Sequence, residues 1–90
     1  MRTRKGLGIS NARQMYIASW ARCARDLGEN AILREICREA GGEYYRALTA
    51  YVTSDMTPVA VSLKYNVSRA TLYRVTRKFY LVAEERIFGE

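Results

Sequence analysis

The sequence predicts an all-α fold, a small helical domain of about five helices. Three observations predict it. Apolar residues recur at the three- and four-residue spacings that are typical of amphipathic helices. The glycines fall between these segments, and the single proline, Pro58, stands where a helix is expected to begin. Apolar residues make up 49% of the 90 residues, which is enough for a modest core in one domain without metal or disulfides.

The domain is expected over residues 10–90, after a basic, glycine-containing arm at residues 1–9. A first helix is predicted from Ser10 to Leu27, with Ser10 or Asn11 as its N-cap and Gly28 as its stop. Trp20 is expected near the edge of the apolar face of this helix. The predicted face consists of Met15, Ile17, Ala18, Ala21, Ala24 and Leu27.

Two shorter helices are expected next, over residues 29–40 and 43–53, with Gly41 and Gly42 between them. The predicted apolar face of the earlier one consists of Ile32, Leu33, Ile36 and Cys37. That of the later one consists of Tyr44, Ala47, Leu48, Tyr51 and Val52. Residues 54–56 are expected to break the helical pattern.

A further helix start has clear local signals. Thr57 can cap a helix, and Pro58 at the first helical position loses no hydrogen bond, because that N–H has no helical partner. A short helix should follow and end at Asn66, because asparagine tolerates the left-handed backbone that turns a chain out of a helix. Ser68 is then expected to cap a second helix.

The spacing of buried and turn residues over about 57–80 predicts a helix-turn-helix. This motif needs a small residue where its helices touch, a turn residue four positions later and then an apolar residue; Ser62, Asn66 and Val67 fill these places. Leu72 and Val75 supply the buried positions of the second helix. Val61 and Tyr65 supply the inner face of the first helix.

Residues 61–74 resemble the DNA-binding helix-turn-helix of resolvases and invertases. Ser62 and Asn66 depart from that pattern, in which Ala and Gly are usual, and the catalytic domain of those recombinases has no counterpart here. A wider stretch, about 45–87, is similar to the small transcriptional regulators of the PapB and KorA types, in which a helix precedes the motif and a long recognition helix follows it. The resemblance implies binding to double-stranded DNA.

The charge agrees with a polyanionic partner, since the formal net charge is +6 and residues 64–78 carry five cations and no acid. The residues expected to contact bases in the major groove are Arg69, Ala70, Tyr73, Arg74 and Arg77. Those expected to contact phosphates are Thr57, Lys64, Ser68, Thr71 and Lys78. A minor-groove arm of Arg2, Arg4 and Lys5 is an alternative to a frayed, solvated terminus.

Other function classes have little support in the sequence. The chain has no His, and Cys23 and Cys37 lack the spacing of a zinc site, so both are expected to be reduced, buried side chains, with no metal or cofactor. Without a nucleophile motif an enzyme is not expected, and no small-molecule substrate is evident. The acids are expected to form salt bridges at the surface; those considered are Asp26, Glu29, Glu35 and Glu39.

No apolar run approaches a membrane span and no signal peptide is recognisable, so a cytoplasmic, nucleoid-associated protein is expected. After Lys78, Glu84 and Glu85 would repel DNA, so the helix should have left the groove there. The apolar residues of this last segment are expected either to close the core or to form a homodimer contact. They are Phe79, Val82, Ala83, Ile87 and Phe88.

The sequence thus predicts a sequence-specific transcriptional regulator, a repressor of a bacterial, plasmid or phage promoter, acting as a homodimer. Two alternatives remain open. One is a DNA-architectural, recombination or packaging accessory protein. The other is a protein-interaction module, such as an inhibitor, that uses the same helices as a scaffold without binding DNA.

Overall fold

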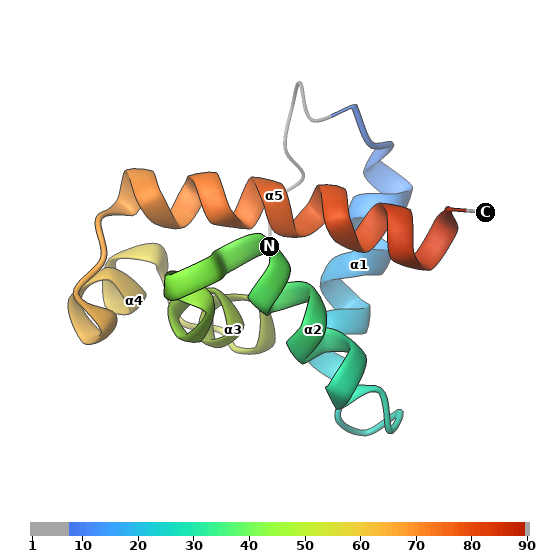
Figure 1. Cartoon of the computed structure of the whole chain (residues 1–90), viewed down its shortest axis with the longest axis horizontal. Helices are drawn as coiled ribbons and strands as arrows, with labels where there is room; N and C mark the ends of the chain where they lie inside the picture. Colours follow the sequence, from blue (N-terminus) through green and yellow to red (C-terminus); the bar gives the residue numbers. More distant parts are fainter. Residues whose placement is uncertain (1–7, 90) are drawn as a thin grey trace.

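The computed structural model describes residues 8–89, and these residues form helices and turns with no strand, as the sequence predicts. The elements are α1 (Asn11–Cys23), α2 (Asn30–Gly41), a short 3₁₀ helix η1 (Gly42–Tyr44), α3 (Tyr45–Thr53), α4 (Pro58–Tyr65) and α5 (Arg69–Phe88). Figure 1 shows α5 along one side of the molecule, with α2, α3 and α4 beside it and α1 crossing its C-terminal half. No described helix is both long and apolar enough to cross a membrane.

The helix starts are fixed by side chains that the sequence identified as caps. The Ser10 hydroxyl accepts a hydrogen bond from the Arg13 N–H at 3.2 Å. Thr57 accepts one from the Ala60 N–H at 3.1 Å at the start of α4. Each bond satisfies an amide that has no partner within the helix, so the three-residue spacing of cap and donor determines where the helix begins.

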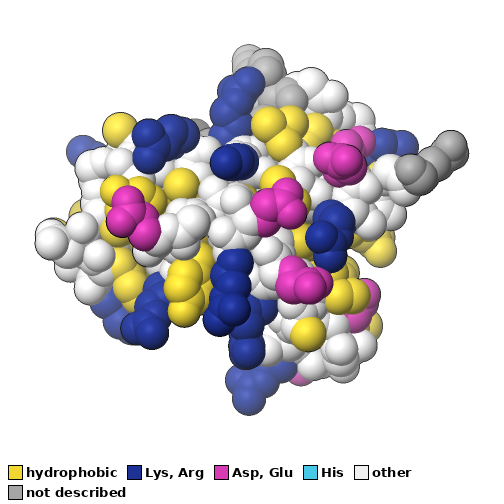
Figure 2. All heavy atoms as spheres, viewed as in Figure 1, with side chains coloured by type: hydrophobic (Ala, Val, Ile, Leu, Met, Phe, Trp, Pro, Cys, Tyr) yellow, Lys and Arg dark blue, Asp and Glu magenta, His cyan; other side chains and the backbone are white. Residues whose placement is uncertain are grey.

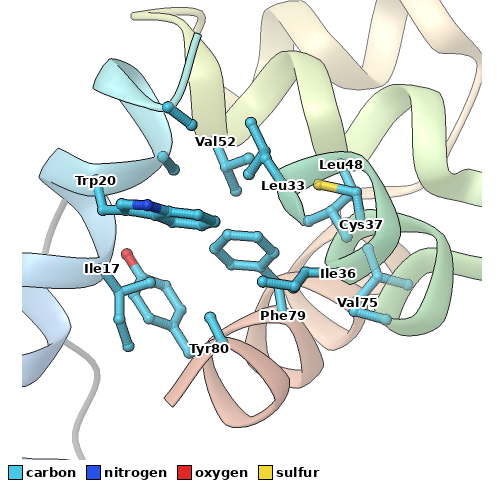
Figure 3. Close-up of a cluster of buried hydrophobic side chains, with 14 of the residues drawn as sticks. Ile17, Trp20, Leu33, Ile36, Cys37, Leu48, Val52, Val75, Phe79 and Tyr80 are labelled. Carbon is cyan, nitrogen blue, oxygen red and sulfur yellow. The ribbon is translucent and has the colours of Figure 1, made fainter. Parts of the chain in front are cut away.

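The core forms where α5 packs against the other helices. Its buried side chains recur every three or four residues, as the period of a helix requires when one face is covered. Figure 3 shows Phe79 between Trp20 of α1 and Ile36 of α2, with Tyr80 beside it. The rings of Phe79 and Tyr80 meet edge to face, with centroids 5.8 Å apart. The C-terminal half of α5 therefore connects α1 to α2.

The first helix is shorter than predicted. It ends at Cys23 instead of Leu27, because the Glu29 N–H turns back to donate to the Ala24 carbonyl at 2.7 Å. Gly28, with φ +74°, supplies the left-handed backbone that this reversal needs. Residues 24–28 consequently form turns, and Leu27 is 60% exposed.

The predicted apolar face of α1 is also partly wrong. Met15 is 63% exposed, whereas Gln14 is buried and its side-chain amide donates to the Ile9 carbonyl at 2.9 Å. That hydrogen bond removes the penalty for burying an amide, so a polar residue can occupy the core face. Ile32 of α2 is likewise exposed, contrary to prediction.

The two cysteines differ in environment, and the prediction that both are buried is wrong for Cys23, which is exposed. Cys37 is buried, and desolvation raises the pKa of its thiol, with a smaller opposing effect from a hydrogen bond to Thr49. The Cys37 thiol is therefore held in its neutral form, packed as a small apolar side chain.

The predicted surface salt bridges are found for Glu35, which pairs with Arg86 at 3.1 Å. Glu29 instead accepts a hydrogen bond from the Trp20 indole N–H at 3.3 Å. Of the two roles expected for the apolar residues at the end of α5, the structure shows core packing. Phe79 and Ala83 are buried, and Val82, Ile87 and Phe88 are half-buried against the same core.

Candidate nucleic-acid interface

The candidate interface is built on the turn between α4 and α5. Asn66 adopts φ 54° and ψ 48°, the left-handed conformation that the sequence predicts, and its N–H donates to the Ser62 carbonyl. The Val67 N–H donates to the same carbonyl at 3.2 Å. Two hydrogen bonds to one carbonyl and a left-handed residue end α4 and redirect the chain within three residues.

The start of α5 follows directly from this turn. The Ser68 hydroxyl accepts a hydrogen bond from the Thr71 N–H at 3.1 Å and donates one to the Thr71 hydroxyl at 2.9 Å. The first amides of α5 stay exposed at a capped helix N-terminus, and such amides favour negative charge.

Burial divides α5 into an inner and an outer face at its N-terminal end. Leu72, Val75 and Thr76 are buried, and Thr76 donates its hydroxyl proton to the Leu72 carbonyl at 2.6 Å. All of the residues predicted to contact bases are exposed; these are Arg69, Ala70, Tyr73, Arg74 and Arg77. The structure therefore places these side chains together on the outer face of one helix.

The residues predicted to contact phosphates are more dispersed. Ser68 and Lys78 are exposed at the border of the outer face, but Thr71 is half-buried with its hydroxyl bonded to Ser68. The Lys64 ammonium lies 5.6 Å from the centre of the Tyr65 ring. Tyr65 lines a groove between α2, α3 and α4, which Lys64 itself does not line.

The cations of this region are largely uncompensated. Within residues 8–89, no ion pair involves Lys64, Arg69, Arg74 or Lys78. The ion pairs that the structure shows lie elsewhere, and one of them joins Arg13 of α1 to Glu84 of α5 at 2.6 Å. Charges without internal partners are available to an external anion.

Two carboxylates border the row of cations on one side. Glu39 and Glu43 line a hollow of about 340 Å³ together with Arg74 and Lys78. Arg69 does not line this hollow, so the two carboxylates border Arg74 and Lys78 but not Arg69. This arrangement was not predictable from the sequence, because it arises where the end of α2 and η1 lie beside α5.

A second group of cations lies on α2 and α3 and was not among the predicted site residues. Figure 2 shows Lys and Arg side chains gathered along the lower edge of the molecule. On α2 and α3, Arg38 and Arg46 contact the Tyr45 ring, and Arg34 lines the same groove as Tyr45 and Arg46. The four-residue spacing of Arg34 and Arg38 places them on one side of α2, but their proximity to Arg46 depends on how α2 packs against α3.

The arm residues Arg2, Arg4 and Lys5 lie outside the residues that the structure describes. Between residues 8 and 89, no group of three or more Cys, Asp or Glu side chains is placed to hold a metal ion. Comparison of the chain with models of protein families, with curated proteins and with solved structures finds no match. Its function is therefore inferred from its own residues.

Proposed function

We propose that this protein is a sequence-specific transcriptional regulator that binds double-stranded DNA through a helix-turn-helix formed by α4 and α5. The observation that carries the proposal is the outer face of α5, where exposed cations without a carboxylate on the same helical segment follow a capped N-terminus. A helix of this kind fits the major groove of B-DNA. The resemblance of residues 61–74 to resolvase-type motifs agrees with this proposal.

In the proposed complex, the N-terminal half of α5 lies in the major groove. Arg69 and Arg74 donate to guanine O6 and N7, and Ala70 and the Tyr73 ring pack on thymine methyl groups. Phosphate oxygens accept hydrogen bonds from the N-terminal ends of α4 and α5 near Thr57 and Ser68. The carboxylates of Glu84 and Glu85 lie beyond the groove, toward the C-terminal end of the helix.

We also propose a homodimer, since one helix-turn-helix covers only a half-site. The support is an exposed apolar region where α1 meets the end of α5: Met15 and Tyr16 are exposed, and the Tyr16 ring packs edge-on against Phe88 at 5.3 Å. Sedimentation at micromolar concentration tests it. A monomer of 10.3 kDa that still binds one specific site would contradict the dimer.

The test of DNA binding is fluorescence anisotropy with labelled duplex DNA at several salt concentrations. Each phosphate neutralised should contribute about 0.9 to the slope of log affinity against log salt. The double variant Arg69→Ala/Arg74→Ala should bind more weakly and with a shallower slope. Arg25→Ala removes one exposed arginine near the end of α1 and serves as the control for charge. If DNA affinity does not depend on salt and the double variant binds as well as the original protein, the protein-interaction module would be favoured.

Selection of bound sites from random duplexes distinguishes the remaining functions. A regulator should enrich a short palindrome, whereas an architectural or packaging protein should enrich no single site and should coat or bend the DNA. Enrichment of a palindrome that footprints near a promoter would establish regulation.

A further inference from the structure

A groove of about 470 Å³ lies between α2, α3 and α4, and no residue of α5 lines it. Its charged and aromatic lining consists of Arg34, Tyr45, Arg46 and Tyr65, and Leu33 and Ala50 supply apolar surface. No described lining residue is acidic. The volume is within the range of about 300–1,000 Å³ that is usual for small-molecule sites.

Tyr45 contacts Arg46, which lines this groove, and also Arg38, which does not line it. The guanidinium carbon of Arg38 lies 5.2 Å from the centre of the Tyr45 ring, and that of Arg46 lies 6.0 Å from it. The Arg46 Nε–H also donates to the Tyr45 hydroxyl at 3.4 Å. Contact with the ring and hydroxyl of Tyr45 restricts the Arg46 side chain, so less conformational entropy is lost when a ligand binds it.

The charge of these arginines is not neutralised internally. In the described part of the chain, Arg34, Arg38 and Arg46 form no ion pair, whereas Arg13, Arg22 and Arg86 each pair with a carboxylate. The positive field also acts on Tyr45, whose pKa is lowered by the hydrogen bond and charge of Arg46 and, to a smaller extent, by Arg38. Arg34 and Arg46 line the groove beside apolar surface and form no ion pair with a described residue. Two such guanidinium groups suit an oxyanion attached to an organic group.

We propose that this groove binds a small organic anion, with a carboxylate or phosphate group held by Arg34 and Arg46 and its apolar part against Leu33 and Tyr65. Asn30, at the edge of the groove, adds an amide donor. The site does not depend on DNA binding, because the groove excludes α5. In Figure 1 α3 and α4 lie beside α5, but the residues that line the groove belong to α2, α3 and α4 alone, so the groove and the outer face of α5 are separate surfaces.

The proposal is tested by amide NMR spectra of the full chain during titration with phenyl phosphate, and separately with benzoate, at constant ionic strength without DNA. Saturable shifts are expected at the amides of residues 30–34, 45–53 and 65, with little change along residues 69–78. Phenol, which lacks the oxyanion, should produce no saturable shift. Arg34→Ala and Arg46→Ala should each weaken binding roughly tenfold, the effect of losing a charged hydrogen bond.

Arg25→Ala is the matched control, because it removes the same charge outside the groove and should leave the affinity unchanged. Equal weakening by Arg25→Ala would show general charge attraction and overturn the proposal. Absence of saturable shifts with both anions would also overturn it. The same would follow if duplex DNA shifted the groove amides and displaced phenyl phosphate, since the groove would then be part of the nucleic-acid surface. If the protein does not bind DNA, the result expected from this titration is unchanged, because the titration contains no DNA.

Discussion

From Arg69 to Lys78, α5 carries four cations and no carboxylate, whereas from Phe79 to Phe88 it carries Glu84, Glu85 and one cation, Arg86. In the second half, Glu84 pairs with α1, and Arg86 pairs with α2. In the first half, Arg69 and Arg74 form no ion pair with a described residue. One continuous helix therefore has a C-terminal half in which Glu84 and Arg86 pair with other helices, and an N-terminal half in which Arg69 and Arg74 are exposed without such pairs.

Because of this difference, we expect folding stability and the proposed DNA binding to depend on different parts of one helix. The C-terminal half packs between α1 and α2 through large buried side chains, while the N-terminal half buries Leu72 and Val75 and exposes its outer face. Substitutions on the outer face of the first half should therefore change binding with little effect on folding. Substitutions on the inner face of the second half should lower the free energy of unfolding without removing any residue proposed to contact DNA.

The largest expected effect is on stability, from Phe79→Ala. Phe79 is fully buried between α1 and α2, so its truncation should lower the free energy of unfolding by about 3–5 kcal/mol. Arg69→Ala, on the exposed face, should change it by no more than about 0.5 kcal/mol. Urea denaturation followed by circular dichroism measures both values. If the two variants lose similar amounts of unfolding free energy, the two halves of α5 contribute equally to stability and the comparison fails.

The next effect concerns DNA. Arg69→Ala and Arg74→Ala should each cost about 1–3 kcal/mol on the preferred site and reduce the ratio of specific to non-specific affinity. Lys64→Ala should weaken all sequences about equally and reduce the salt slope by about one unit, leaving that ratio nearly unchanged. Paired titrations with the selected site and a scrambled duplex measure the ratio.

The control for this experiment comes from the other half of the helix. Arg86→Ala removes a cation that pairs with Glu35 and should leave both affinities unchanged. If Arg69→Ala, Arg74→Ala and Lys64→Ala lower both affinities by one common factor, α5 holds the backbone without recognising bases. The architectural function would then replace the regulator.

The local structure of the α4–α5 turn was predictable because its signals lie within a few residues. Thr57, Asn66 and Ser68 each act on neighbouring backbone groups, and the structure confirms the caps and the left-handed turn. The buried positions Leu72 and Val75 followed from the period of the helix.

Features that depend on packing between distant segments were not predictable. The face that α1 buries was predicted correctly for Ile17 and Ala21 but not for Met15, and burial of Gln14 depends on a hydrogen bond to the Ile9 carbonyl, outside the helix. The proximity of Arg34 and Arg46 likewise requires the angle between α2 and α3. The carboxylates beside Arg74 were missed for the same reason, since they reach α5 only through the fold.

The turn itself provides a smaller effect that tests how firmly the first half of α5 is held. Asn66→Val should lower the free energy of unfolding by about 1 kcal/mol or more, because a β-branched side chain fits a left-handed backbone poorly. Asn66→Gly should be neutral or stabilising. Thermal melts that rank the two variants in the opposite order would contradict the strain expected at this position.

The smallest effect is expected at the contact between α4 and α5. The Ser62 hydroxyl oxygen is buried and has no hydrogen-bond partner among the described residues, although its own backbone carbonyl accepts from the turn. A buried hydroxyl without a partner opposes folding, and alanine has the higher helix propensity. Ser62→Ala should therefore raise the free energy of unfolding by about 0.5–1 kcal/mol, measured by urea denaturation. DNA affinity should be unchanged, because the side chain faces the other helix.

The control is Thr57→Ala at the N-cap of the same helix. It removes a hydroxyl that accepts a hydrogen bond from the Ala60 N–H, so it should lower the free energy of unfolding by about 1 kcal/mol. A loss of stability in Ser62→Ala would mean that the hydroxyl forms a hydrogen bond, and the N-terminal half of α5 would then be held against α4 by a polar contact as well as by apolar packing.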